Sequence, residues 1–175
     1  MLRPTSALKK ADIDKLISEI NERKIPLSQM KERGQVVLAD FIKTEIVKQD
    51  NISDGVTKRD LTYELWFNGH LSGKILLNID SKPAFHVTEI LFGENAENKI
   101  DMVNEAMKET LNVFSGHLSS FFHDYGYEID IGVPISSGHN VLDSKADLKL
   151  LFRYTSDEKP FQFFVEINPE DAEDN

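Results

Sequence analysis

A long amphipathic helix is the strongest pattern in this 175-residue sequence. Between residues 98 and 121, apolar residues recur every three or four positions, the spacing of one face of an α-helix. Such a helix buries that face and leaves the opposite one in water. The apolar stripe consists of Ile100, Val103, Met107, Leu111, Phe114, Leu118 and Phe121.

The outer face of this predicted helix carries a carboxylate beside a carboxamide. At about 100° per residue, Glu109 lies roughly 160° from Leu111, and Asn112 lies roughly 100° from it. Glu109 and Asn112 are three residues apart and are therefore neighbours on one surface patch. Held on a rigid helix, the two groups can present a water molecule to a partner. A chain with 15 Glu and 11 Asn contains about one such pair by chance, so an ordinary solvated face is the alternative.

Composition excludes several classes of function. The net charge of −10, with no stripe of Lys and Arg to offset it, argues against nucleic acid as a partner. The absence of cysteine excludes disulfides and thiolate chemistry. No apolar run approaches the roughly 18 residues of a membrane span, and residues 1–10 lack the apolar core of a signal peptide. We therefore expect a soluble, cytoplasmic protein with no membrane partner.

The other periodic segments predict an α+β fold, a two-layer α/β sandwich in which long helices cover a mainly antiparallel sheet. Short turns between strands imply antiparallel neighbours, and the alternation leaves one sheet face polar, so the helices should cover mainly the other. Gly34 weakens the second helix by about 1 kcal/mol and is a candidate break in it. The predicted elements are helices at 12–23, from Ser28 towards Val47, at 81–93 and at 98–126, a hairpin at 62–79 turning at Asn68-Gly69, and a three-strand meander at 127–167.

Three segments follow from these patterns. Residues 1–34 are predicted to form an N-terminal helical extension, and residues 35–168 the main domain. Residues 169–175 are acidic and are predicted to be disordered.

No metal or nucleotide site is predicted. No pair of histidines has the i, i+4 spacing of a helical metal site, and there is no cysteine to assist. The segment Gly69-His70-Leu71-Ser72-Gly73-Lys74 is too short for a phosphate-binding loop and lacks a Ser or Thr after the Lys.

Three motifs stand out within roughly residues 35–168. The first is an acidic residue followed by Glu-x-x-Asn and a Gly on the long helix. The second is a short strand that ends in Pro, with a Gly beyond it, and the third is a hairpin of the type Gly-x-x-x-Gly-Lys. In this sequence they are Glu105 with Glu109-Thr110-Leu111-Asn112-Val113-Phe114-Ser115-Gly116, then Ile131-Gly132-Val133-Pro134-Ile135-Ser136-Ser137-Gly138, then Gly69 to Lys74. Together these motifs resemble the CheX/CheC family of chemotaxis phosphatases.

This resemblance implies a function and a role for each site residue. Residues 35–49 contain no second Glu-x-x-Asn, so the chain is similar to the one-site CheX type. The substrate implied is the aspartyl phosphate of a CheY-type response regulator, which brings its own Mg²⁺. Asn112 would orient the attacking water and Glu109 would dock the Lys of the regulator. Glu105, Lys108 and Gly116 would bind the partner.

The resemblance also implies a homodimer, because CheX-type relatives pair through sheet edges. Two departures keep other functions open. Family members usually have Asp at the position of Glu105, and the residues before Gly116 are Ser115 rather than Ala and the bulky Phe114. A module of the same fold that binds a response regulator without hydrolysis, or a scaffold, is therefore the alternative.

Overall fold

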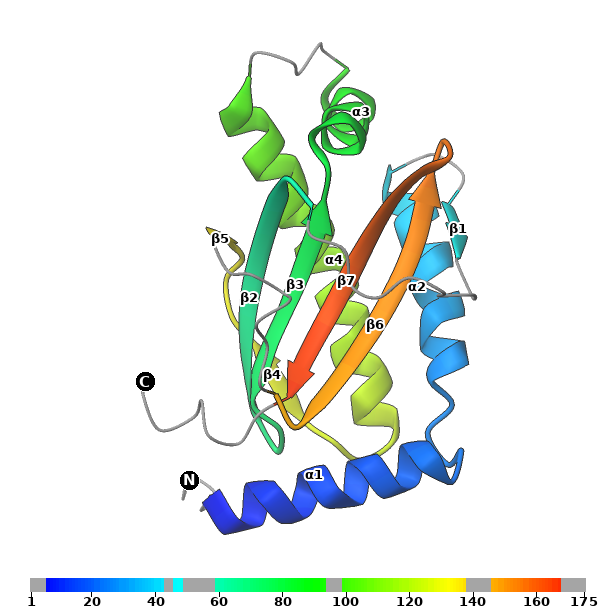
Figure 1. The fold of residues 1–175 in the computed structure, drawn as a ribbon, viewed down its shortest axis with the longest axis vertical. Helices are drawn as coiled ribbons and strands as arrows, with labels where there is room; N and C mark the ends of the chain where they lie inside the picture. The colour runs from blue at the N-terminus through cyan, green and yellow to red at the C-terminus, as the bar shows by residue number, and fades with distance from the viewer. Residues whose placement is uncertain (1–5, 43–45, 49–58, 94–98, 138–145, 168–175) are drawn as a thin grey trace.

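The computed structural model describes residues 6–42, 46–48, 59–93, 99–137 and 146–167. It is an α+β fold of two layers, in which a seven-stranded antiparallel sheet carries its long helices on one face (Figure 1). The predicted fold class is therefore confirmed. None of the helices within these ranges is long and apolar enough to cross a membrane.

The sheet has the order β1-β6-β7-β3-β2-β4, and β5 also pairs with β2. Every pairing is antiparallel. The hairpin of β2 and β3 turns at residues 70–72, one step beyond the predicted Asn68-Gly69 turn. The strands are β1 (Ile46–Lys48), β2 (Leu61–Gly69), β3 (Gly73–Ile79), β4 (Ile129–Ile131), β5 (Ile135–Ser137), β6 (Leu148–Ser156) and β7 (Lys159–Ile167).

The predicted C-terminal meander is wrong. Strands β6 and β7 form a hairpin between β1 and β3, whereas β4 and β5 pair with the opposite edge of β2. Residues 138–147 separate β5 from β6, more than a tight hairpin needs, so the chain is free to cross to the other side of the sheet. Hydrophobic alternation identified strands but not their partners.

Four helices complete the fold, and two of them carry the sheet's buried face. Helices α2 (Leu27–Ile42) and α4 (Ile100–Asp124) lie along that face, while α3 (Ser81–Phe92) lies at one end and α1 (Ser6–Asn21) crosses the other end (Figure 1). Helix α3 ends as predicted at Gly93, whose φ of 68° suits a glycine C-cap. Helix α2 ends at Ile42 rather than near Val47, which belongs to β1.

Gly34 does not break α2 but brings it close to the sheet. A Cβ at this position would collide with the hydroxyl oxygen of Tyr154 on β6 and would lie 3.2 Å from Cε2 of Phe114 on α4. The Tyr154 hydroxyl donates a hydrogen bond of 3.0 Å to the carbonyl oxygen of Lys31, one turn earlier in α2. The predicted boundary between residues 34 and 35 falls inside this helix, and the division into segments stays a prediction; residues 169–175 lie outside the described ranges.

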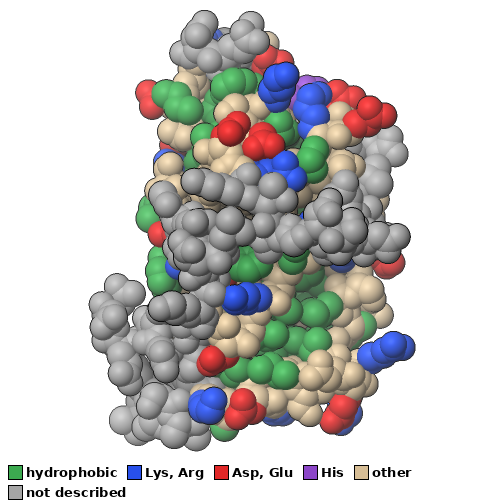
Figure 2. All heavy atoms as spheres, in the orientation of Figure 1, with side chains coloured by type: hydrophobic (Ala, Val, Ile, Leu, Met, Phe, Trp, Pro, Cys, Tyr) green, Lys and Arg blue, Asp and Glu red, His purple; other side chains and the backbone are tan. Residues whose placement is uncertain are grey.

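The core lies between the helices and one face of the sheet. On β2, Tyr63, Leu65 and Phe67 face the helices and are buried. The opposite face of the sheet carries a smaller apolar cluster of Leu76 and Phe164. In Figure 2, which views that outer face, hydrophobic side chains lie among scattered charged ones.

Candidate functional site

Helix α4 carries the candidate site, and its inner face holds it against the sheet. The Phe114 ring is fully buried and stacks on Phe163 of β7, with ring centroids 3.9 Å apart and an interplanar angle of 9°. The Phe152 ring lies 5.5 Å from Phe114 between centroids. All seven residues of the predicted apolar stripe are buried except Ile100, at the first position of the helix. This packing fixes which side of α4 faces outward.

The predicted site residues lie on the outward side of α4. At about 100° per residue, Glu105, Glu109, Asn112 and Gly116 fall within an arc of about 60°, and Lys108 lies about 40° outside it. The side chains of Glu109 and Asn112 are exposed. Within the described residues, neither makes a hydrogen bond or ion pair. Both groups are therefore available to a partner.

Two of the predicted partner-binding residues bond each other. The Nζ atom of Lys108 lies 3.0 Å from Oε1 of Glu105. This pair is partly exposed and adds little to stability. The pair matters for the site because it holds the ammonium group of Lys108 on Glu105 and not on Glu109. The carboxylate of Glu109 is left without a positive partner among the described residues.

Gly116 leaves an open space on the same face. A Cβ built at this position meets no atom within 4 Å. Glycine in the middle of a helix is less favourable than alanine by about 1 kcal/mol, and no neighbouring atom among the described residues requires glycine there. The open surface allows the backbone of a partner to approach α4 closely.

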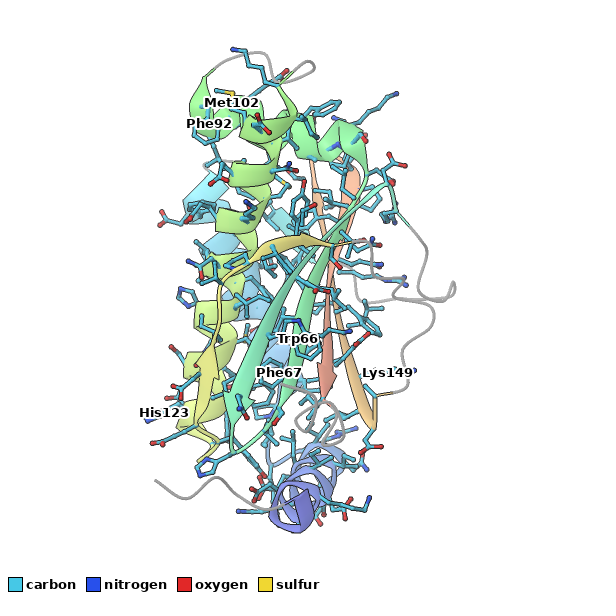
Figure 3. All side chains as sticks on the ribbon, turned by 90° about the vertical axis from the view of Figure 1, so that its left-hand side faces the viewer. Trp66, Phe67, Phe92, Met102, His123 and Lys149 are labelled. Carbon is cyan, nitrogen blue, oxygen red and sulfur yellow. The ribbon has the colours of Figure 1, made fainter. Side chains whose placement is uncertain are left out.

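A hydrogen bond ties each end of the site to the sheet. The Ser119 hydroxyl donates to the carbonyl oxygen of Ile129 on β4, at 3.0 Å. The Tyr63 hydroxyl donates to Oδ1 of Asn104, at 2.8 Å. Burial raises the pKa of Tyr63 to about 12, so this hydroxyl keeps its proton at neutral pH. Figure 3 shows the chain from β4 to β5 running beside α4, with Met102 near one end of the helix and His123 near the other.

The structure places all five predicted site residues on one helix face, but it also adds a feature that the sequence reasoning missed. The link between β4 and β5 flanks the helix at the level of the site. Its sequence signal is Ile131-Gly132-Val133-Pro134, part of the strand motif that ends in Pro; the Gly138 of that motif lies outside the described residues. No group of three or more His, Asp or Glu within the described ranges is placed to hold a metal ion.

Comparisons with known proteins agree with this architecture. A sequence profile of the family described as "Chemotaxis phosphatase CheX" matches residues 65–147. No curated protein matches the sequence significantly. Among solved structures, a CheX from Desulfovibrio desulfuricans has a TM-score of 0.67 and 16% identity, covering 82% of this chain and all of that one.

Two further structures are similar. The CheX of a CheX–CheY–BeF₃–Mg²⁺ complex from Borrelia burgdorferi has a TM-score of 0.68 and 19% identity, covering 82% of this chain and 99% of that one. A CheX from Vibrio vulnificus has a TM-score of 0.66 and 16% identity, covering 77% and 91%. At these identities the structures show a shared fold. The profile match covers 83 of the 175 residues, and over that segment the chain is similar to the CheX family of chemotaxis phosphatases.

Proposed function

We propose that this protein is a phosphatase that hydrolyses the aspartyl phosphate of a CheY-type response regulator. The family is described as a chemotaxis phosphatase, and a similar CheX structure is a complex with CheY. The observation that carries the proposal is the pair Glu109 and Asn112. Both are exposed one turn apart on a rigid helix and unbonded among the described residues.

Asn112 orients the attacking water. Phosphoryl transfer passes through a loose transition state, so positioning the nucleophile supplies much of the catalysis. A carboxamide both donates and accepts hydrogen bonds, and it carries no charge that would repel the phosphoryl oxygens. The core packing beneath α4 holds the backbone of Asn112 in place, which is the rigidity that such positioning needs.

Glu109 docks the regulator. A carboxylate next to a phosphoryl group is repelled by it, so Glu109 is a poor choice for holding the water. A lysine in the active site of the regulator is its natural partner, because Lys108 is already paired with Glu105 at 3.0 Å. An ion pair that loses its water in the complex is worth more than one at the surface.

The other predicted residues, Glu105, Lys108 and Gly116, lie on either side of Glu109 and Asn112 along α4. Gly116 offers open space one turn beyond Asn112, and the Glu105–Lys108 pair borders the site on its other side. The Mg²⁺ belongs to the regulator, where it neutralises the phosphoryl group. The Borrelia burgdorferi complex, which contains Mg²⁺ together with CheY, is consistent with this assignment.

Phosphate release from the phosphorylated response regulators of the same organism tests the proposal. We expect the wild-type chain to accelerate release from at least one of them, and Asn112→Ala to abolish the acceleration without loss of binding. Asn21→Ala makes the same change at an exposed position of α1 and should leave the rate unchanged.

The two alternatives have distinct outcomes in this assay. A chain that binds a regulator without accelerating phosphate release is a binding module. A chain that neither binds a regulator nor accelerates phosphate release is the scaffold. Release at the wild-type rate after Asn112→Ala would reject the role proposed for Asn112.

A further inference from the structure

The link between β4 and β5 contains a β-bulge beside the candidate site. On β4, Ile131 pairs with Phe67 of β2, whereas on β5 Ile135 pairs with Glu64. The two residues of β2 between these pairs therefore face three residues of the link, 132–134. An extra residue of this kind bends a strand and redirects its side chains, and bulges are frequent at sheet edges and next to active sites.

The sequence of the link builds this bulge. The Gly132 N–H donates a hydrogen bond of 2.7 Å to the carbonyl oxygen of Trp66, and a Cβ on Gly132 would lie only 3.0 Å from that oxygen. Pro134 has no N–H to donate to the β2 ladder. Glycine permits the close approach and proline ends the pairing, so Val133 is held between them outside the ladder.

Counted from the hydrogen bond between Ser119 and Ile129, ideal helix and strand rises bring Asn112 and Val133 to similar levels along α4. The Ser119 hydroxyl is bonded to Ile129, and Asn112 is two helical turns before Ser119 on the same flank of α4, about 10.5 Å away. Val133 is four residues beyond Ile129, about 13 Å along the strand direction. The bulge therefore runs beside the flank of α4 on which Asn112 lies.

The exposure of Val133 has no explanation within the described part of the chain. Its side chain is 82% exposed, more than any other large hydrophobic residue in these ranges. In the alternation of β4 it follows Ile129 and Ile131, which are on the helix side of the sheet. The bulge shifts the alternation of inward and outward side chains by one residue. Ile135 therefore lies on the outer face of the sheet, opposite its pairing partner Glu64 on β2.

We propose that Val133 is an apolar docking residue for the receiver domain of the response regulator. This inference rests on the partner proposed above and adds a second contact to it. Contacts that surround the energetically dominant residues of an interface exclude water from them. An apolar side chain of the receiver, next to its phosphorylation site, packs on Val133 while Glu109 and Asn112 reach the phosphoryl group.

Binding of the regulator in its BeF₃⁻ and Mg²⁺ form, together with single-turnover phosphate release, tests this contact. Burial of one valine side chain is worth about a tenfold change in affinity. We expect Val133→Ala to weaken binding about tenfold and Val133→Asp to weaken it further, while the rate of the bound complex stays at the wild-type value. Asn112→Ala should show the reverse, with binding retained and the rate lost.

Ile135→Asp is the matched control, since it introduces the same charge two residues away, on the outer sheet face that Ile135 shares with Glu64. Wild-type affinity in Val133→Asp would overturn the docking role, as would equal weakening by Ile135→Asp. Self-association that Val133→Asp abolishes while regulator binding persists would assign Val133 to a contact between copies instead. If the wild-type chain binds a regulator but releases no phosphate, the proposed enzyme activity is rejected. The affinities of Val133→Asp and Ile135→Asp then decide the docking role by themselves.

Discussion

Phe114 on α4 stacks face to face on Phe163 of β7, with ring centroids 3.9 Å apart. Asn112 is two residues before Phe114, which places it about 200° away around the helix. This fully buried ring therefore helps to fix the rotation of the helix that presents the site. The bulky Phe114, which departs from the family pattern, has a structural role beneath the proposed catalytic residues.

Phe114→Ala should strongly destabilise the fold. Replacement of a buried phenylalanine by alanine lowers the free energy of unfolding by about 3–5 kcal/mol, because it removes apolar contacts and leaves a cavity. Urea denaturation measures the change. Val36→Ala, at a position that is 68% exposed on α2, should stay within about 0.5 kcal/mol of wild type. Equal effects in the two variants would contradict this account of the core.

The two glycines inside helices should respond in opposite ways to alanine. Gly34→Ala places a methyl group against the Tyr154 hydroxyl and the Phe114 ring, so we expect a loss of about 1–3 kcal/mol from overpacking. Gly116→Ala meets no neighbouring atom and should gain about 1 kcal/mol from helix propensity. Thermal or urea unfolding of both variants checks the signs.

Gly116→Ala should also separate stability from function. If a partner backbone approaches α4 at this point, the added methyl group weakens regulator binding while the fold becomes more stable. A variant that is more stable and binds as well as wild type would remove Gly116 from the interface.

Glu109→Lys should weaken both regulator binding and phosphate release, and more strongly than Glu109→Ala. Alanine removes one partner of the proposed ion pair, whereas lysine replaces attraction with repulsion inside a contact that loses its water. Affinity for the BeF₃⁻ form and the rate of phosphate release are the measurements. Glu128→Lys makes the same charge change at an exposed position after α4 and serves as the control. Unchanged binding in both Glu109 variants would make Glu109 an ordinary surface residue.

The long helix and the outward orientation of Glu109 and Asn112 were predictable because one repeating pattern determines both. The spacing that buries Leu111 and Phe114 also turns Glu109 and Asn112 outward, without any knowledge of the partner strands. The cap of α3 at Gly93 was predictable for a similar local reason, since its positive φ suits glycine.

Strand partners and the bulge were not predictable from such patterns. The side-chain alternation of Ile129 and Ile131 is the same whether β4 pairs with β2 or with β6, so the meander was a plausible but wrong arrangement. The bulge depends on a difference of one residue between two pairings, Phe67 with Ile131 and Glu64 with Ile135. That difference becomes visible only when β2 is known to be the partner.

Alkaline pH should destabilise the fold partly through Tyr63. Burial raises the pKa of Tyr63 to about 12 from its ordinary value near 10. The unfolded chain therefore loses this proton first as the pH rises, so the stabilising contribution is complete below pH 10 and is lost between about pH 10 and 12. Urea midpoints measured from pH 8 to 11 should fall less steeply in Tyr63→Phe than in wild type. Part of the fall should remain, because burial also raises the pKa of Tyr154.

Finally, we predict a homodimer that leaves both copies of the site accessible. In the described sheet, β1 lies at one edge and β4 with β5 at the other. Bulges and prolines discourage edge-to-edge pairing, and the second edge contains both in residues 132–134. The edge at β1 is therefore the better candidate for a two-fold contact, which is the commonest closed assembly.

This arrangement predicts how the mass of the particle responds to salt and to mutation. Two chains of net charge −10 repel each other, and salt screens the repulsion beyond about 10 Å at 0.1 M, so added salt should favour the dimer. Light scattering at micromolar concentration should give twice the 19.9 kDa of one chain. Val133→Asp should leave that mass unchanged, because Val133 lies on the opposite edge from β1. A mass near 19.9 kDa at every concentration and salt level would reject the dimer but not the roles proposed for Glu109 and Asn112, since both lie on a single chain.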